Sequence, residues 1–61
     1  MHNGKTFYIA KEAPEFMMIA ELIAAMEETH NFSNLIVNVV SVITGELFAR
    51  RNSIGLWEIY V

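Results

Sequence analysis

Glu27 and His30 form the most suggestive chemical spacing in this sequence, because they stand three positions apart within an apolar-periodic segment. Residues three apart on a helix project to the same side, and a carboxylate and an imidazole so placed are ligands in di-iron bundles. Such a centre needs further carboxylates, which the rest of the chain does not supply at a matching spacing. A protonated histidine at a helix end is also favoured by the helix dipole. The sequence therefore predicts no metal site and no cofactor.

Other patterns that could carry chemistry are incomplete. Gly4-Lys5-Thr6 matches only the last residues of a phosphate-binding loop, without the upstream glycine or the following helix. Glu27 and Glu28 are sequence neighbours that diverge by ~100° around a helix, so they do not pair as acid and base. The chain has no Cys and no Asp, and none of its serines has the glycine context of a nucleophile elbow. We therefore expect a protein that is not an enzyme.

Periodicity predicts the elements that would position these residues. Residues 5–10 alternate as a short strand of β-branched and aromatic side chains. Residues 14–29 have the periodicity of an amphipathic helix, with Pro14 in its first turn, where a missing N–H costs nothing. His30-Asn31 is expected to close this helix, because Asn tolerates the left-handed conformation. The predicted core face consists of Phe16, Met18, Ile19, Leu22, Ile23 and Met26.

Residues 35–43 fit two structures. Apolar positions 35, 36, 39, 40 and 43 match a helix, which would give a helix-turn-helix plus a C-terminal hairpin. Six Val and Ile residues, stiff at χ1, favour a strand instead. Turns at Thr44-Gly45 and Asn52-Ser53 then lead to strands over 47–51 and 54–61. We predict a single α+β domain over 1–61, with one helix packed on a small antiparallel sheet in the order β-α-β-β-β.

The last hairpin predicts a sheet that is apolar on both faces. A two-residue turn at Asn52-Ser53 would pair Phe48 with Trp57, and paired residues share a face. One face is then lined by Phe48, Trp57, Ile59 and Val61, and the other by Leu47, Ala49, Leu56 and Tyr60. One short helix covers one face only, and monomers rarely expose large apolar patches. We therefore expect a homodimer or a partner-bound subunit with Leu47, Leu56 and Tyr60 in the interface.

Acidic residues gather on or beside the predicted helix. Five of the seven acids lie there, namely Glu12, Glu15, Glu21, Glu27 and Glu28. Complementary charge speeds the encounter of two proteins, and Met17 adds an adaptable apolar contact among these acids. We expect Met17, Glu21 and Glu28 to contact a protein partner that has a basic patch. Arg51 is expected to hold a carboxylate of a partner chain.

Composition and charge narrow the class of function. The 61 residues are 54% hydrophobic and 18% charged, which argues against disorder, and the net charge of −3 with four Lys and Arg residues disfavours nucleic acid. The apolar runs are too short to span a membrane, and residues 1–5 lack the pattern of a secretory signal, so we expect a cytoplasmic protein.

These observations together predict a small acidic, non-enzymatic protein–protein interaction module of the adaptor or inhibitor type, homodimeric through an apolar sheet face. Two alternatives are open. A winged-helix-like nucleic-acid-binding protein would require residues 33–44 to be helical and the hairpin with Arg50 and Arg51 to act as the wing. A structural assembly subunit would use both apolar faces of the sheet.

Overall fold

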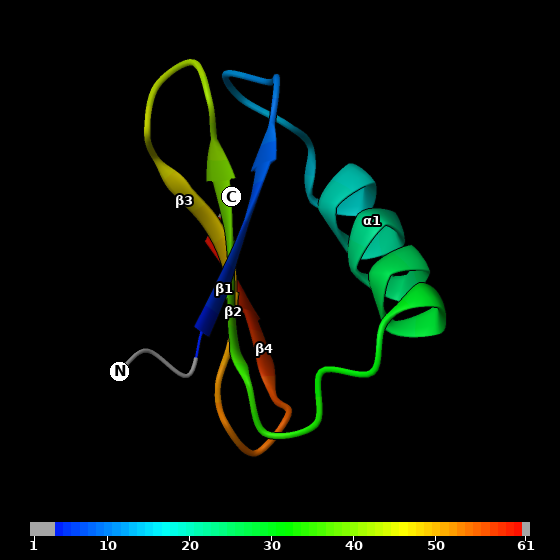
Figure 1. The fold of residues 1–61 in the computed structure, drawn as a ribbon. Coiled ribbons are helices and arrows are strands. Elements are labelled where there is room, and N and C mark those ends of the chain that lie inside the picture. The colour runs from blue at the N-terminus through cyan, green and yellow to red at the C-terminus, as the bar shows by residue number, and fades with distance from the viewer. Residues whose placement is uncertain (1–3, 61) are drawn as a thin grey trace.

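Five elements follow one another in residues 4–60, which are the residues described by the computed structural model (Figure 1). They are β1 (Gly4–Ile9), α1 (Phe16–Thr29), β2 (Ile36–Ser41), β3 (Leu47–Arg51) and β4 (Trp57–Ile59). The α+β class and the order β-α-β-β-β are as predicted from the sequence. Residues 36–41 are a strand, so the helix-turn-helix alternative is wrong; the stiff β-branched side chains prevail over the helical spacing. Val61, predicted in the last strand, lies outside the described residues.

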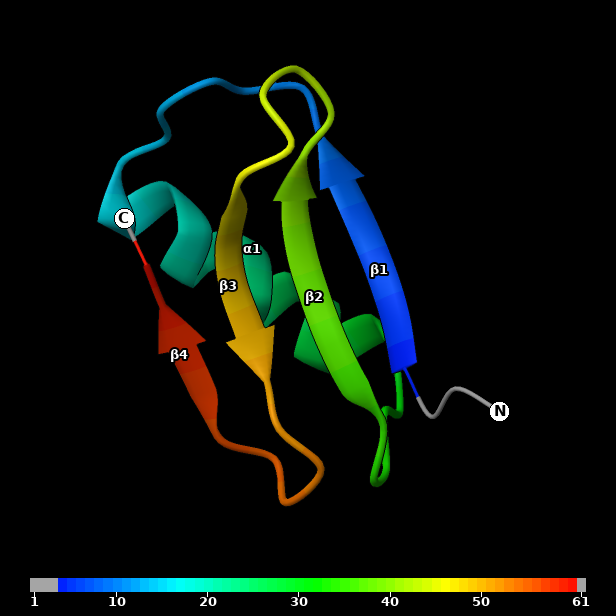
Figure 2. The same cartoon turned by 90° about the vertical axis from the view of Figure 1, so that its left-hand side faces the viewer.

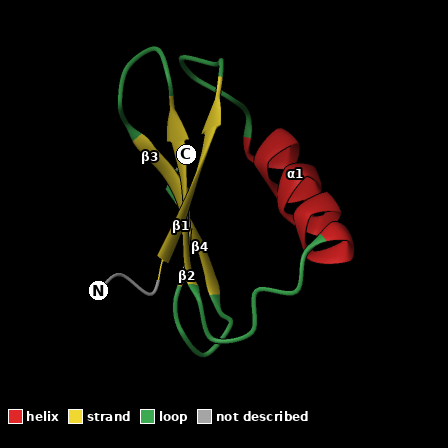
Figure 3. Ribbon diagram, viewed as in Figure 1, coloured by secondary structure: helices red, strands yellow, loops and turns green. Residues whose placement is uncertain are grey.

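The four strands form one sheet in the order β1-β2-β3-β4, and α1 lies against one of its faces (Figures 2 and 3). β2, β3 and β4 form the expected antiparallel meander. β1, however, runs parallel to β2, so the sheet is mixed where a wholly antiparallel one was predicted. The reason is that α1 returns the chain to the end of the sheet at which β1 begins, as in any crossover between parallel strands.

The helix begins two residues later than predicted. Glu15 is its N-cap residue, in an extended conformation and without a side-chain capping hydrogen bond, and Pro14 lies before the helix instead of in its first turn. Phe16, the first helical residue, is 57% exposed and does not join the core face where we expected it. Phe16 comes before Ile19, the first residue of the helix that is fully buried.

The end of α1 also differs in detail from the prediction. His30 is the C-cap residue and is extended, with its backbone N–H donating to the Met26 carbonyl at 2.9 Å. The left-handed residue is Ser33, with φ of 54°, and not Asn31. The chain therefore leaves the helix extended and makes its sharp turn three residues beyond His30.

The core lies between α1 and the sheet. Its buried side chains are Ile19, Ile23, Met26, Phe32, Val37, Val39, Phe48 and Ala49. Met18 and Leu22 of α1, both predicted for the core face, pack partly buried against this cluster, as do Trp57 and Ile59 of β4. One helix and one sheet face thus account for the core.

The β3–β4 hairpin has a longer turn than predicted. Asn52 Oδ1 accepts from the backbone N–H groups of Ile54 at 3.1 Å and Leu56 at 3.0 Å, which spreads the turn over residues 52–56. Trp57 therefore pairs with Arg51 instead of Phe48. The pairing is thus shifted by three positions, yet Phe48, Trp57 and Ile59 still share the core face, as predicted from the sequence.

Ala49, predicted on the second face, lies in the core instead, where it pairs with Ile59. The pairing of β2 with β3 is irregular between Val39 and Val40, because Val39 pairs with Ala49 and Val40 with Leu47. Phe48 is the extra residue between these two pairs. Such a bulge lets consecutive residues turn to one side, and Phe48 and Ala49 both belong to the core.

Candidate functional site

The outer sheet face, defined as the face turned away from α1, carries two rows of side chains across the strands. Strand pairing aligns the polar row, which consists of Thr6, Asn38, Arg50 and Glu58. It also aligns the apolar row, which consists of Tyr8, Val40 and Leu47. Because side chains alternate along a strand, these residues point away from the face that packs on α1. The outer sheet face therefore has an apolar part beside a polar one.

The apolar row continues into the hairpin between β2 and β3. Tyr8 on the edge strand β1 is 67% exposed, and Leu47 is also exposed. Val42 and Ile43 follow β2 directly and are exposed too. The hairpin that carries them bends to the side away from α1 (Figure 1). Tyr8, Val40, Val42, Ile43 and Leu47 are called the apolar patch below.

Of the three predicted interface residues, Leu47 lies in the apolar patch. Leu56 is exposed but lies in the turn before β4, at the far end of the sheet from the β2–β3 hairpin. Tyr60 is half-exposed and lines a recess of about 260 Å³ with Pro14 and Phe48, near the loop that leads into α1. The structure does not bring the three together, because the longer β3–β4 turn leaves Leu56 outside β4 and Tyr60 lies beside the recess.

The residues predicted to bind a protein partner on the helix are exposed. Met17 is 65% exposed, and Glu21 and Glu28 are both exposed on α1. Phe16, predicted for the core face, is a second exposed apolar side chain at the start of the helix.

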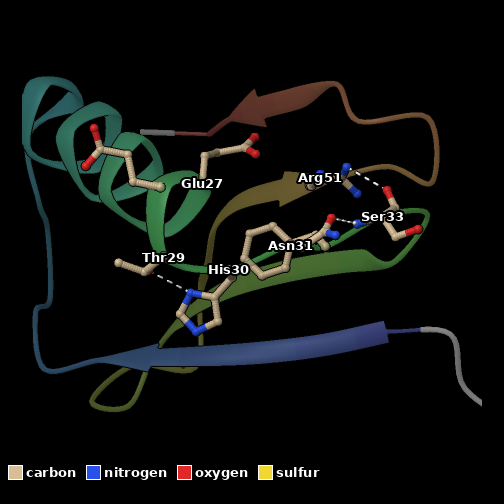
Figure 4. A pocket seen from close by; sticks show the side chains of 8 residues that line it. Glu27, Thr29, His30, Asn31, Ser33 and Arg51 are labelled. Carbon is tan, nitrogen blue, oxygen red and sulfur yellow. Dashed lines mark hydrogen bonds between the residues drawn. The ribbon is translucent and has the colours of Figure 1, made fainter.

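Arg51 has an internal role that the sequence did not indicate. It is only 8% exposed, with Nη1 donating to the Leu35 carbonyl at 2.6 Å and Nη2 to the Ser33 carbonyl at 2.8 Å (Figure 4). Its guanidinium also lies 5.7 Å from the centre of the Phe32 ring. Arg51 therefore holds the α1–β2 connection against the sheet. A guanidinium so engaged is not presented to a partner, so we do not retain Arg51 as a partner contact.

The structure separates the functional groups of Glu27 and His30. Both line an open recess of about 590 Å³ at the end of α1 (Figure 4). Glu27 Oε1 accepts from Trp57 Nε1 at 2.7 Å. His30 turns the other way, with its ring stacked on Phe32 and its Nδ1 2.9 Å from Thr29 Oγ1. Glu27 and His30 therefore contact other residues of the chain instead of each other.

Two further findings concern residues 4–60. No cluster of three or more His, Cys, Asp or Glu side chains is arranged to hold a metal ion in this part of the chain. Its single helix is also too short to reach across a bilayer.

Comparison of the chain with protein-family models, curated proteins and solved structures gave no match.

Proposed function

We propose that this chain is a small, non-enzymatic protein-interaction module that binds another protein surface through its outer sheet face. The observation that carries the proposal is the apolar patch on a face that α1 does not cover. A patch of this kind on a small monomer is unfavourable in water and is a common mark of a protein-binding surface. Covering the patch with protein removes its apolar area from water, which stabilises a complex by ~25 cal/mol per Å² before the costs of association.

The distribution of residue types on this face resembles the anatomy of interfaces. Tyr8 supplies a large amphipathic anchor, a residue type enriched among those that dominate binding energy. Leu47 and Val40 add apolar area beside it. The polar row supplies groups that form hydrogen bonds with a partner and fix its register. An apolar part beside a polar one favours a specific contact over non-specific adhesion.

The acidic side of α1 is a second surface that can bind a protein. An adaptor or inhibitor would use this surface for its partner. Glu21, Glu28 and Met17 face solvent there and suit a protein with a basic patch. A cytoplasmic location belongs to the same proposal. The assembly alternative, in which both sheet faces are used between subunits, does not suit this fold because α1 covers the inner face.

Hydroxyl-radical footprinting tests whether protein covers the outer sheet face. Tyr8 and Ile54 are suitable probes, because they are 67% and 79% exposed and Ile54, in the β3–β4 turn, belongs to neither proposed contact. We expect oxidation of Tyr8 to fall relative to Ile54 when the purified chain is concentrated, or when extract of its native cell is added to the dilute chain. A Tyr8-to-Ile54 oxidation ratio that stays the same under both conditions would contradict the proposal.

A further inference from the structure

We infer that the occupant of the outer sheet face is a second copy of this chain, stacked on it sheet to sheet; this inference rests on the proposed function. Among residues 4–60, the outer sheet face carries one cation, Arg50, and one anion, Glu58, which are paired in the register of β3 and β4. Their charges cancel. The face is therefore neutral as well as apolar, and two identical copies of it meet without net repulsion.

The helix side of the molecule has the opposite character. Its exposed acids are Glu12, Glu15, Glu21, Glu27 and Glu28. Two copies that met through α1 would bring these carboxylates together, and like charges facing each other across an interface oppose association. Charge thus selects the outer sheet face as the surface at which two copies associate, and it leaves the helices on the outside of the pair.

The polar row is complementary to itself. The two stacked sheets can be related by a two-fold axis that runs parallel to the strands and passes above the space between β2 and β3. This rotation places β2 of one copy over β3 of the other, and β1 over β4. Arg50 of one copy then lies over Asn38 of the other, and Glu58 lies over Thr6. An amide oxygen accepts from a guanidinium, and a hydroxyl donates to a carboxylate. Each charged group therefore meets a neutral hydrogen-bonding group instead of a like charge.

The same axis places apolar residues on apolar residues. Val40 of one copy lies over Leu47 of the other, because these two residues pair across β2 and β3. The strands of six, six, five and three residues cover roughly 300 Å² of flat area at the usual strand spacing and rise, which is less than a tenth of the accessible surface of 4283 Å². Two such faces, even with the exposed hairpin residues, fall below the ~1,200 Å² in total of stable specific interfaces and in the range of weak, transient ones. We therefore expect a dimer of micromolar affinity.

Charge-reversal variants of Arg50 and Glu58 test this arrangement in the full chain. Arg50→Glu gives the face two negative charges, and Glu58→Arg gives it two positive charges. Each variant also places like charges side by side within its own sheet, which lowers the folding stability of the two variants to a similar extent. Only contact between copies can restore association when the two variants are mixed. Sedimentation equilibrium of each variant, of their 1:1 mixture and of the natural chain measures this directly.

We expect the natural chain to approach twice its 7.0 kDa mass at high micromolar concentration. Each variant alone should dissociate about tenfold more readily, which corresponds to ~1.4 kcal/mol. The 1:1 mixture should recover the dimer, now formed by one copy of each variant. Ala24→Arg, which adds a charge at an exposed position of α1, is the control and should change the dissociation constant by less than about twofold. Melting curves check that every variant is folded.

Two results would overturn the inference and leave the proposed function standing. The first is a natural chain that stays at 7.0 kDa while cell extract protects Tyr8 in the footprinting experiment, since the occupant is then a different protein. The second is a dimer that both charge variants form as tightly as the natural chain, since the copies then meet elsewhere, for example along the free edge of β1. Absence of any protection of Tyr8 would overturn the proposed function itself.

Discussion

The Arg51 guanidinium ties the Leu35 carbonyl to the sheet through an N–H···O bond of 2.6 Å that spans sixteen residues of sequence. A second donor of the same group holds the Ser33 carbonyl at 2.8 Å. Ser33 is the residue with positive φ at which the chain turns from α1 towards β2. One buried side chain of β3 thus fixes the connection between the helix and the second strand.

Arg51→Lys should lower the free energy of unfolding by about 2 kcal/mol. An ammonium group cannot reproduce the two arms of the guanidinium, and a hydrogen bond to a charged group contributes ~1.5–3 kcal/mol. Urea unfolding followed by circular dichroism measures the change. Arg50→Lys is the control, because Arg50 is exposed on the next position of the same strand and should change stability by less than ~0.5 kcal/mol. Equal losses for the two variants would show that the bonds of Arg51 are not important for stability.

Ser41→Ala should destabilise the fold by ~1–3 kcal/mol, the usual cost of leaving buried polar groups unpaired. Ser41 is 1% exposed, and its Oγ donates to the Lys11 carbonyl at 2.6 Å. The same oxygen accepts from the backbone N–H groups of Ile43 and Thr44. Thermal unfolding compared with that of Ser53→Ala, an exposed serine in the last turn, checks the prediction. A melting temperature of Ser41→Ala as high as that of the control would refute it.

Gly55→Ala should be more destabilising than Gly45→Ala. Both glycines have positive φ, 97° and 79°, so both substitutions incur a conformational cost of ~1–2 kcal/mol. A Cβ at Gly55 would also lie 3.2 Å from Arg51 Nη2 and crowd the guanidinium, whereas nothing lies within 4 Å of a Cβ at Gly45. Chemical denaturation of the two variants side by side gives the difference. If Gly45→Ala proves the worse of the two, the contact between Gly55 and Arg51 is not as described.

Glu27→Ala should change the fluorescence of the single tryptophan. Trp57 Nε1 donates to Glu27 Oε1 at 2.7 Å, and losing this acceptor leaves the indole N–H to water. The emission maximum should therefore move to longer wavelength. Glu27→Gln retains an acceptor oxygen and should restore most of the natural spectrum. Glu28→Ala removes the neighbouring carboxylate and should leave the emission maximum in place, and a shift equal to that of Glu27→Ala would count against the bond.

The sequence predicted the order of elements because each signal for it is local. Alternation in residues 5–10 and the Val and Ile residues between 36 and 43 specify strands without reference to the rest of the chain. The β3–β4 register was missed because it depends on the Asn52 side chain, which accepts two backbone N–H groups and lengthens the turn. The sequence alone does not distinguish this turn from a two-residue one.

The candidate site was predicted only in part, because some of its features depend on contacts between elements that are far apart in the sequence. The sequence predicted an uncovered apolar face because one helix can cover only one of the two apolar faces of the sheet. Leu47 lies on the uncovered face as expected. Tyr8, the most exposed member of the apolar patch, was assigned to a strand but not to an interface, because its position beside Val40 depends on the parallel pairing of β1 with β2. The internal role of Arg51 depends on carbonyls that come within reach only after α1 packs.

The central claim is that two copies of this chain associate through the outer sheet face, and sedimentation velocity of Tyr8→Glu against Met17→Glu tests it most directly. Both substitutions introduce one charge at a side chain about two-thirds exposed in the single chain. The account predicts that the natural chain and Met17→Glu associate as concentration rises, while Tyr8→Glu stays at 7.0 kDa. Identical sedimentation of Tyr8→Glu and Met17→Glu at every concentration would contradict it.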